Sequence, residues 1–176
     1  MKLRCGKGIE CPEDFSFLYK KKYVTRAGIV PYIIDRLDDT YILLGIDKST
    51  GVYADLGGTR EKGETTLDVA IREFLEESRS VLSVDLKKTT TIMISDVTPK
   101  RLRSKKIRKQ VILFPRIELN QYNIDIDKAF QSTVPKNKYE DEMSRLEWVK
   151  LDEFLTIPNS QLSRSLKEVK KILQKL

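Results

Sequence analysis

Apolar residues recur along this chain in two rhythms, which predict strands in some stretches and helices in others. Runs rich in β-branched and aromatic side chains predict strands at residues 24–34, 41–46, 89–95, 111–118 and 145–151. The first two runs flank a charged turn, and the next two flank a basic segment, so each pair predicts a β-hairpin. A 3.6-residue spacing predicts a helix to about residue 80 and an amphipathic helix from residue 160 or 161 to 176.

The first of these helices is predicted to have an apolar face and an acidic face. Thr65 or Thr66 can act as N-cap, because a threonine oxygen accepts a free backbone N–H at a helix start. At about 100° per residue, one face, predicted to be buried, holds Leu67, Ala70, Ile71, Phe74 and Leu75. Glu73, Glu76 and Glu77 fall within an arc of roughly 100° on the far side.

Three carboxylates at this spacing repel one another, which costs a few tenths of a kcal/mol for each pair. A hard divalent cation bound among them would turn this repulsion into a net attraction, because magnesium prefers carboxylate oxygens and substrate phosphates. The alternative is an acidic face that only contacts solvent. The residues around the three glutamates decide between the two.

Those residues resemble the Nudix box, Gly-x5-Glu-x7-Arg-Glu-U-x-Glu-Glu-x-Gly-U, where U is a bulky aliphatic residue. The matching positions are Gly58, Glu64, Arg72, Glu73, the bulky Phe74, Glu76 and Glu77. Two late positions depart: Arg79 stands where the family has glycine, and Ser80 where it has an aliphatic residue. The family glycine lets the chain leave the helix, so the departure bears on the helix end more than on the metal ligands.

The resemblance implies an α/β fold, a Nudix-type α/β/α sandwich around a mixed β-sheet. We expect it over residues 23–176, preceded by an N-terminal extension at residues 1–22. It also implies Mg²⁺-dependent hydrolysis, with Mn²⁺ as a second metal, of a diphosphate linkage that joins a nucleoside diphosphate to another group. The substrate is then a nucleotide or a polyphosphate.

Roles for individual residues follow from the same resemblance. Glu76 and Glu77 are expected as metal ligands, Glu73 as a third ligand or the general base, and a carbonyl of Gly57 or Gly58 as a neutral ligand. Arg72 and Glu64 are expected to pair as positioning groups in catalysis. Arg26 lies in a small-residue strand like the one beneath the substrate in Nudix proteins, and we expect it to bind substrate. In some members a distant acid is the base, and the candidates here are Glu118, Glu140 and Glu142.

Histidine is absent from the sequence, which excludes Ser-His-Asp and Cys-His catalysis and histidine-ligated metal sites. Cys5 and Cys11 are the only cysteines, too few for a four-ligand zinc site, and we expect them to be free thiols. Chemistry must therefore use carboxylates, cations, hydroxyls and bound metal.

The formal charge of +7 equals the charge of one segment. Residues 100–109 hold seven cations and no acid, so 7 − 7 = 0 remains for the rest of the chain. Such a run favours a polyanionic partner. We expect Lys105, Lys106, Arg108 and Lys109 to contact the phosphates of a substrate such as RNA. The alternative is a loop tip that only aids solubility.

The sequence does not select the substrate. The basic run favours 5′-capped RNA, as in mRNA decapping. A small-nucleotide pyrophosphatase acting on ADP-ribose, nucleotide sugars or dinucleoside polyphosphates, and a diphosphoinositol phosphate hydrolase, are the alternatives. A non-catalytic polyanion-binding module is the alternative from another class. No apolar run approaches 18 residues and no apolar leader is present at the N-terminus, so we expect a cytoplasmic protein without a membrane span. The oligomeric state stays open.

Overall fold

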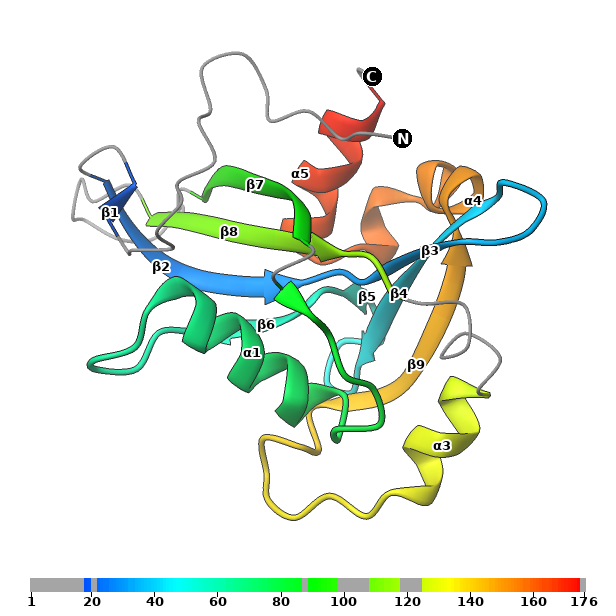
Figure 1. Cartoon of the computed structure of the whole chain (residues 1–176), viewed down its shortest axis with the longest axis horizontal. Coiled ribbons are helices and arrows are strands. Elements are labelled where there is room, and N and C mark those ends of the chain that lie inside the picture. Colours follow the sequence, from blue (N-terminus) through cyan, green and yellow to red (C-terminus); the bar gives the residue numbers. More distant parts are fainter. Residues whose placement is uncertain (1–17, 20–21, 87–88, 98–107, 118–124, 175–176) are drawn as a thin grey trace.

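The structure, a computed structural model, describes residues 18–19, 22–86, 89–97, 108–117 and 125–174 (Figure 1). Several sequence-predicted sites lie outside these ranges: Cys5, Cys11, Lys105, Lys106 and Glu118. Arg108 and Lys109 open a strand, but only their backbone is described. The predicted contacts of the basic run therefore stay predictions.

One mixed sheet holds the strands that follow the order β6-β2-β8-β7, with β1 paired to the start of β2. Its strands are β1 (Leu18–Tyr19), β2 (Lys22–Ile29), β6 (Leu56–Thr59), β7 (Thr89–Val97) and β8 (Arg108–Pro115). β2 and β8 run parallel to each other. β6 pairs antiparallel with β2, and β7 pairs antiparallel with β8. β7 and β8 form the hairpin expected around the basic run. Val97 and Arg108 are the last pair of this ladder in the described residues.

A second, antiparallel sheet is centred on β4. Its strands are β3 (Tyr32–Ile34), β4 (Thr40–Asp47), β5 (Tyr53–Ala54) and β9 (Met143–Lys150). β4 pairs with each of the other three. The hairpin predicted near the start of the domain is the β3–β4 pair. The single strand expected at residues 24–34 is broken at Val30 and Pro31, and its two parts belong to different sheets.

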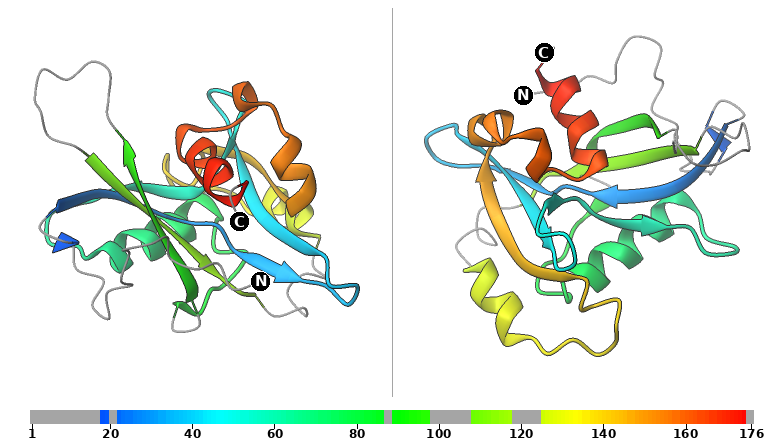
Figure 2. Two further views of the ribbon diagram at one scale, coloured as in Figure 1. Left: turned by 90° about the horizontal axis from the view of Figure 1, so that it is seen from above. Right: turned by 180° about the vertical axis from the view of Figure 1, so that it is seen from behind.

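Helices cover both sides of these strands, which confirms the α/β/α arrangement (Figures 1 and 2). The helices are α1 (Thr66–Glu77), α3 (Ile126–Ser132), α4 (Leu151–Thr156) and α5 (Arg164–Leu173), with a 3-10 turn, η2, at Asn159–Gln161. α1 packs on β2 and β6, α3 on β9, and α5 on the opposite side of the β2–β8 pair from α1. No helix in the described ranges is long and apolar enough to cross a membrane.

Two apolar cores result, one on each side of the central strands. Along β8, Val111 and Leu113 join the core beneath α1, whereas Ile112 and Phe114 join the core beneath α5. A strand buried on both faces reads as a continuous apolar run, which is why this segment was recognisable from sequence. The segment predicted as an amphipathic helix from residue 160 or 161 buries its apolar residues, and the helix itself spans Arg164–Leu173; the buried residues are Leu162, Leu166, Val169 and Leu173.

Candidate active site

Helix α1 begins where the sequence predicts. Thr65 is the N-cap, and its hydroxyl accepts the backbone N–H of Asp68 at 3.2 Å. The Asp68 carboxylate accepts the backbone N–H of Thr65 at 2.8 Å, which completes a capping box. The helix ends at Glu77, three residues earlier than predicted, and Ser78 is its C-cap. These caps fix the start and the end of the segment that carries the three glutamates.

The predicted orientation of α1 is wrong in part. Ala70 and Phe74 are buried as expected, but Ile71 and Leu75 are 36% and 38% exposed. Glu77, expected on the side away from the core, is only 4% exposed. The helix therefore turns part of its acidic side toward β6. Periodicity could not show this, because it counts every glutamate as a solvent-facing residue.

Glycines in β6 make room for this orientation. A Cβ on Gly58 would stand 2.2 Å from the carboxylate carbon of Glu73, so a side chain there is incompatible with the observed position of Glu73. A Cβ on Gly57 would stand 2.3 Å from the Cα of Gly28 on the neighbouring strand. The glycine pair of the motif thus brings α1 and β2 close to the same stretch of β6.

Arg72 joins the loop and helix parts of the motif. Its Nε donates to Oε1 of Glu64 at 2.7 Å, as predicted for a positioning pair. Its Nη1 donates to Glu73 at 2.8 Å and to Glu76 at 3.0 Å, and Nη2 donates to the Thr59 carbonyl at 3.1 Å. The hydrogen bonds that Arg72 donates to Glu64 raise the pKa of Arg72 and lower the pKa of Glu64. A fixed cation therefore already bridges two of the three helix carboxylates.

Glu77 lies deepest in the site. Its Oε2 accepts the backbone N–H of Gly57 at 2.5 Å. Burial raises the pKa of Glu77 well above its ordinary value, and the nearby charge of Asp55 adds to this, while Arg26 and the Gly57 hydrogen bond oppose it. Burial also raises the pKa of Glu73, against the opposing charge of Arg72. Both carboxyl groups therefore hold a proton more readily than a solvated glutamate does.

Behind Glu77 lies a buried polar group that the sequence did not identify. Asp55 is 1% exposed and accepts hydrogen bonds from Nη1 of Arg26 and from the Ser165 hydroxyl of α5. Nη2 of Arg26 donates to the Gly57 carbonyl at 2.6 Å. The observed partners of Arg26 are thus internal, and its predicted contact with substrate stays a prediction. An aspartate directly before Leu56-Gly57-Gly58 was the available signal, but its partners lie 29 and 110 residues away.

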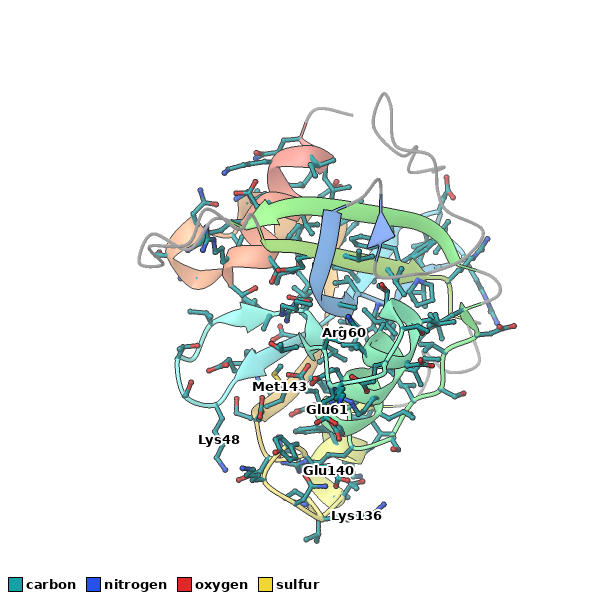
Figure 3. All side chains as sticks on the ribbon, turned by 90° about the vertical axis from the view of Figure 1, so that its left-hand side faces the viewer. Lys48, Arg60, Glu61, Lys136, Glu140 and Met143 are labelled. Carbon is teal, nitrogen blue, oxygen red and sulfur yellow. The ribbon has the colours of Figure 1, made fainter. Side chains whose placement is uncertain are left out.

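Two of the three candidate distant acids lie on the segment between α3 and β9. The Glu140 carboxylate accepts the backbone N–H of Lys136 at 2.8 Å, so it stabilises its own loop. Glu142 is exposed. Burial is the main cause of the raised pKa of Glu73, and the negative charge of Glu142 adds to it. Figure 3 shows this side of the molecule, with Glu61 of the β6–α1 loop, Lys48 of the β4–β5 turn, and Glu140 and Lys136 labelled. Of the two candidates in the described part of the chain, Glu140 bonds its own loop and Glu142 carries a charge that acts on Glu73.

The donor set is chemically suited to a hard cation, because it consists of the three helix carboxylates beside backbone carbonyls of β6. As the side chains stand in the described ranges, no three acidic groups converge on one point that could hold a metal ion. Arg72 bridges Glu73 and Glu76 instead, and Glu77 is bonded to Gly57. Gly58 leaves the space in which the Glu73 carboxylate lies, and to hold a metal the three carboxylates would have to exchange these partners for it.

Comparison with solved structures identifies the fold. A C. elegans Ap4A hydrolase in a binary complex superposes with a TM-score of 0.55 at 16% identity, over 86% of this chain and 96% of that one. A Nudix hydrolase from M. smegmatis, RenU, gives 0.51 at 13% identity, over 87% and 88%. The NUDIX domain of Shewanella oneidensis NrtR, complexed with ADP ribose, gives 0.51 at 13% identity, over 86% of each chain. The chain therefore has the Nudix fold.

No family model and no curated protein matches the sequence. At identities of 13–16% the structural neighbours establish the fold alone. The chemistry of this chain must be argued from its own residues.

Proposed function

We propose that this protein is a Mg²⁺-dependent hydrolase, with Mn²⁺ as an alternative metal, that cleaves a diphosphate linkage in a nucleoside-diphosphate-linked substrate. One observation carries the proposal. The polar positions of the motif, from Gly58 and Glu64 to Glu77, lie in one connected cluster although they come from a strand, a loop and a helix. An acidic face that only contacted solvent would not need glycines opposite it or a buried glutamate.

The charge of the substrate explains why the cluster is useful. A diphosphate carries several negative charges, so attack by water is slow until those charges are neutralised. Glu73, Glu76 and Glu77 would hold Mg²⁺, which would supply that neutralisation and lower the pKa of a bound water. In this proposal Glu76 and Glu77 are ligands, and Glu73 is the third ligand or the general base.

Arg72 and Glu64 have supporting roles in the same scheme. Arg72 holds Glu73 and Glu76 in place in the absence of metal, and Glu64 fixes the guanidinium from the loop side. If metal binding turned the helix carboxylates away, Arg72 would still be bonded to Glu64 and to the Thr59 carbonyl. Its planar, permanently charged guanidinium would then be free to stabilise negative charge on the substrate phosphates.

5′-Capped RNA is our first candidate substrate, because the seven cations of residues 100–109 exceed what a free nucleotide needs. A small nucleotide is the second candidate. The neighbours named as an Ap4A hydrolase and as an ADP-ribose complex, which share the fold, favour it. Both candidates use the same cluster, so they differ in substrate and not in chemistry.

A substrate panel tests the proposal directly. Capped RNA, ADP-ribose, a dinucleoside tetraphosphate and a diphosphoinositol phosphate are incubated with the protein in Mg²⁺, in Mn²⁺ and in chelator, and the phosphate products are identified. We expect metal-dependent cleavage within a diphosphate linkage of at least one of them. Binding of these polyanions without cleavage in either metal would favour the non-catalytic module instead.

A further inference from the structure

Arg79, the residue that stands in place of the motif glycine, connects α1 to the segment between α3 and β9. Its Nε donates to the Glu140 carbonyl at 3.0 Å. Its Nη1 donates to the carbonyls of Phe130 at 3.1 Å and Thr133 at 2.9 Å. The guanidinium carbon also lies 3.9 Å from the centre of the Phe130 ring. The Arg79 side chain thus bonds the backbone at both ends of the segment 133–140 and holds these ends together, a contact we call the clasp.

The backbone at this position is unusual for an arginine. Arg79 has a φ of 51° and Ser80 a φ of 56°, both in the left-handed region. That conformation is strained for a residue with a side chain, whereas glycine adopts it freely. Three hydrogen bonds to backbone carbonyls, made by a side chain that is 9% exposed, offset the cost. The contacts therefore explain how an arginine is tolerated where the chain leaves the helix.

The segment bonded by Arg79 continues into β9. Asp141 pairs with Lys48 at 2.7 Å and lies 3.6 Å from Nη2 of Arg79. The carbonyl of Glu142 accepts the backbone N–H of Lys48 at 2.9 Å. Because these bonds hold the Asp141 side chain and the Glu142 carbonyl, the position of the Glu142 carboxylate depends on how firmly the segment is held. Met143 and Phe74, which directly follow Glu142 and Glu73 in the sequence, are both buried in the core beneath α1.

We propose that Arg79 is a positioning residue, which holds the 133–142 segment against the end of α1 so that Glu142 faces the Glu73 side of the carboxylate cluster. The inference rests on the proposed function, because it adds to the helix carboxylates an acidic group from the segment before β9. The consequence is that a side chain remote from the phosphates controls one wall of the active site. A glycine at position 79 leaves that wall unclasped.

Hydrogen exchange tests the clasp without any substrate. In Arg79→Ala and Arg79→Gly we expect the amides of residues 133–142 to exchange at least ~10-fold faster, while those of residues 66–77 keep their rates. The pair of variants separates two effects, because glycine also relieves the left-handed strain and alanine does not. Arg79→Lys should give intermediate exchange rates, because one ammonium group cannot replace a guanidinium that bonds carbonyls at both ends of the segment. Unchanged exchange in the segment would overturn the proposal.

Kinetics on the best substrate test the positioning. Displacing an acidic group from the site should lower kcat by at least ~10-fold in Arg79→Gly, with KM within about threefold of the parent. Arg79→Lys should recover part of kcat. Glu142→Gln should lower kcat similarly, and the double variant should be no slower than the slower single variant, because both changes remove the same interaction. Additive losses, or a rise in KM alone, would contradict the role.

The two proposals fail in different ways. If the parent protein cleaves none of the panel, the proposed function fails, and the exchange measurement still decides whether Arg79 holds the segment. If the parent is active and Arg79→Gly only lowers the thermal midpoint, with kcat and segment exchange unchanged, the proposed function stands. The positioning role is then wrong.

Discussion

The carboxylate of Glu73 occupies the space that a side chain on residue 58 would need. A Cβ on Gly58 would lie 2.2 Å from Cδ and Oε1 of Glu73 and 2.3 Å from Oε2, far inside van der Waals contact. Gly58→Ala should therefore push Glu73 out of the cluster and lower turnover at least ~10-fold, because small displacements of a reacting group are costly. The measurement is kcat on the best substrate.

The matched control is Gly51→Ala. Gly51 lies in an open turn with nothing within 4 Å of a built Cβ, but its φ of 69° makes alanine strained. This variant should lose roughly 1 kcal/mol of folding free energy and keep its kcat. Equal kcat losses in the two variants would mean that general destabilisation, and not the position of Glu73, explains the Gly58 result.

Burial of Glu77 predicts how the stability of the metal-free protein depends on pH. Because its folded-state pKa is raised above the unfolded value, the folded protein binds the proton more tightly. The contribution is fully present below the unfolded pKa of about 4.3 and is lost as pH rises toward the folded pKa. Glu77→Gln, which can still accept the Gly57 N–H, should therefore be more stable than the parent at pH 7.

Thermal or denaturant unfolding in chelator, from pH 4 to pH 8, measures this difference. Subtracting parent from variant isolates Glu77 from carboxylates with lowered pKa values, such as Glu64 and Asp47, whose contributions have the opposite sign. The advantage of Glu77→Gln should grow with rising pH. A constant difference across the range would show that Glu77 is ionised as readily in the folded protein as in the unfolded chain.

Divalent metal should stabilise the folded protein by mass action. A ligand that binds only the folded state adds about 2.7 kcal/mol when present at 100 times its Kd. Millimolar Mg²⁺ or Mn²⁺ should raise the thermal midpoint relative to chelator, and Glu76→Gln should reduce that rise. Part of the gain is offset, because Arg72 must give up its contacts with Glu73 and Glu76. An identical midpoint with and without metal would count against a site formed before substrate binds.

Much of the fold was predictable because it depends on local patterns. The strand runs, the N-cap at Thr65 and the apolar stripe of α5 follow from residues that are neighbours in sequence or one turn apart. The membership of the cluster was also predictable, from the motif spacing. The direction in which Glu77 points was not, because it depends on the absence of side chains at Gly57 and Gly58 on another element.

Long-range polar contacts were the other part that could not be predicted. In the sequence Asp55 is a single acidic residue between two short strands, yet it is buried because Arg26 and Ser165 donate hydrogen bonds to it from β2 and α5. Arg79 reads as a departure from the motif, and its partners, Phe130, Thr133 and Glu140, lie 51 to 61 residues further along the chain. No periodicity or motif in one sequence reports such pairs, because a tertiary contact sets no local pattern.

The basic run separates a long polyanionic substrate from a small nucleotide. Replacing Lys105, Lys106, Arg108 and Lys109 with serine should weaken capped-RNA binding and flatten its salt dependence. The slope should fall by about 0.7 for each single-strand phosphate that the variant no longer binds. Hydrolysis of a free dinucleotide should change little. Equal losses for both substrates would mean that the run lines the catalytic pocket, and no change for either would mean that it only contacts solvent.

The hydrolysis rate of Glu77→Gln in saturating Mg²⁺, measured beside the parent on the best substrate, tests the central claim most directly. The substitution keeps the size of the side chain and its hydrogen bond with Gly57 but removes the negative charge that the metal requires. We predict a loss in kcat of at least ~100-fold, the scale of removing one major electrostatic contributor, in a protein that remains folded. A variant that hydrolyses the substrate as fast as the parent would contradict the assignment of the active site.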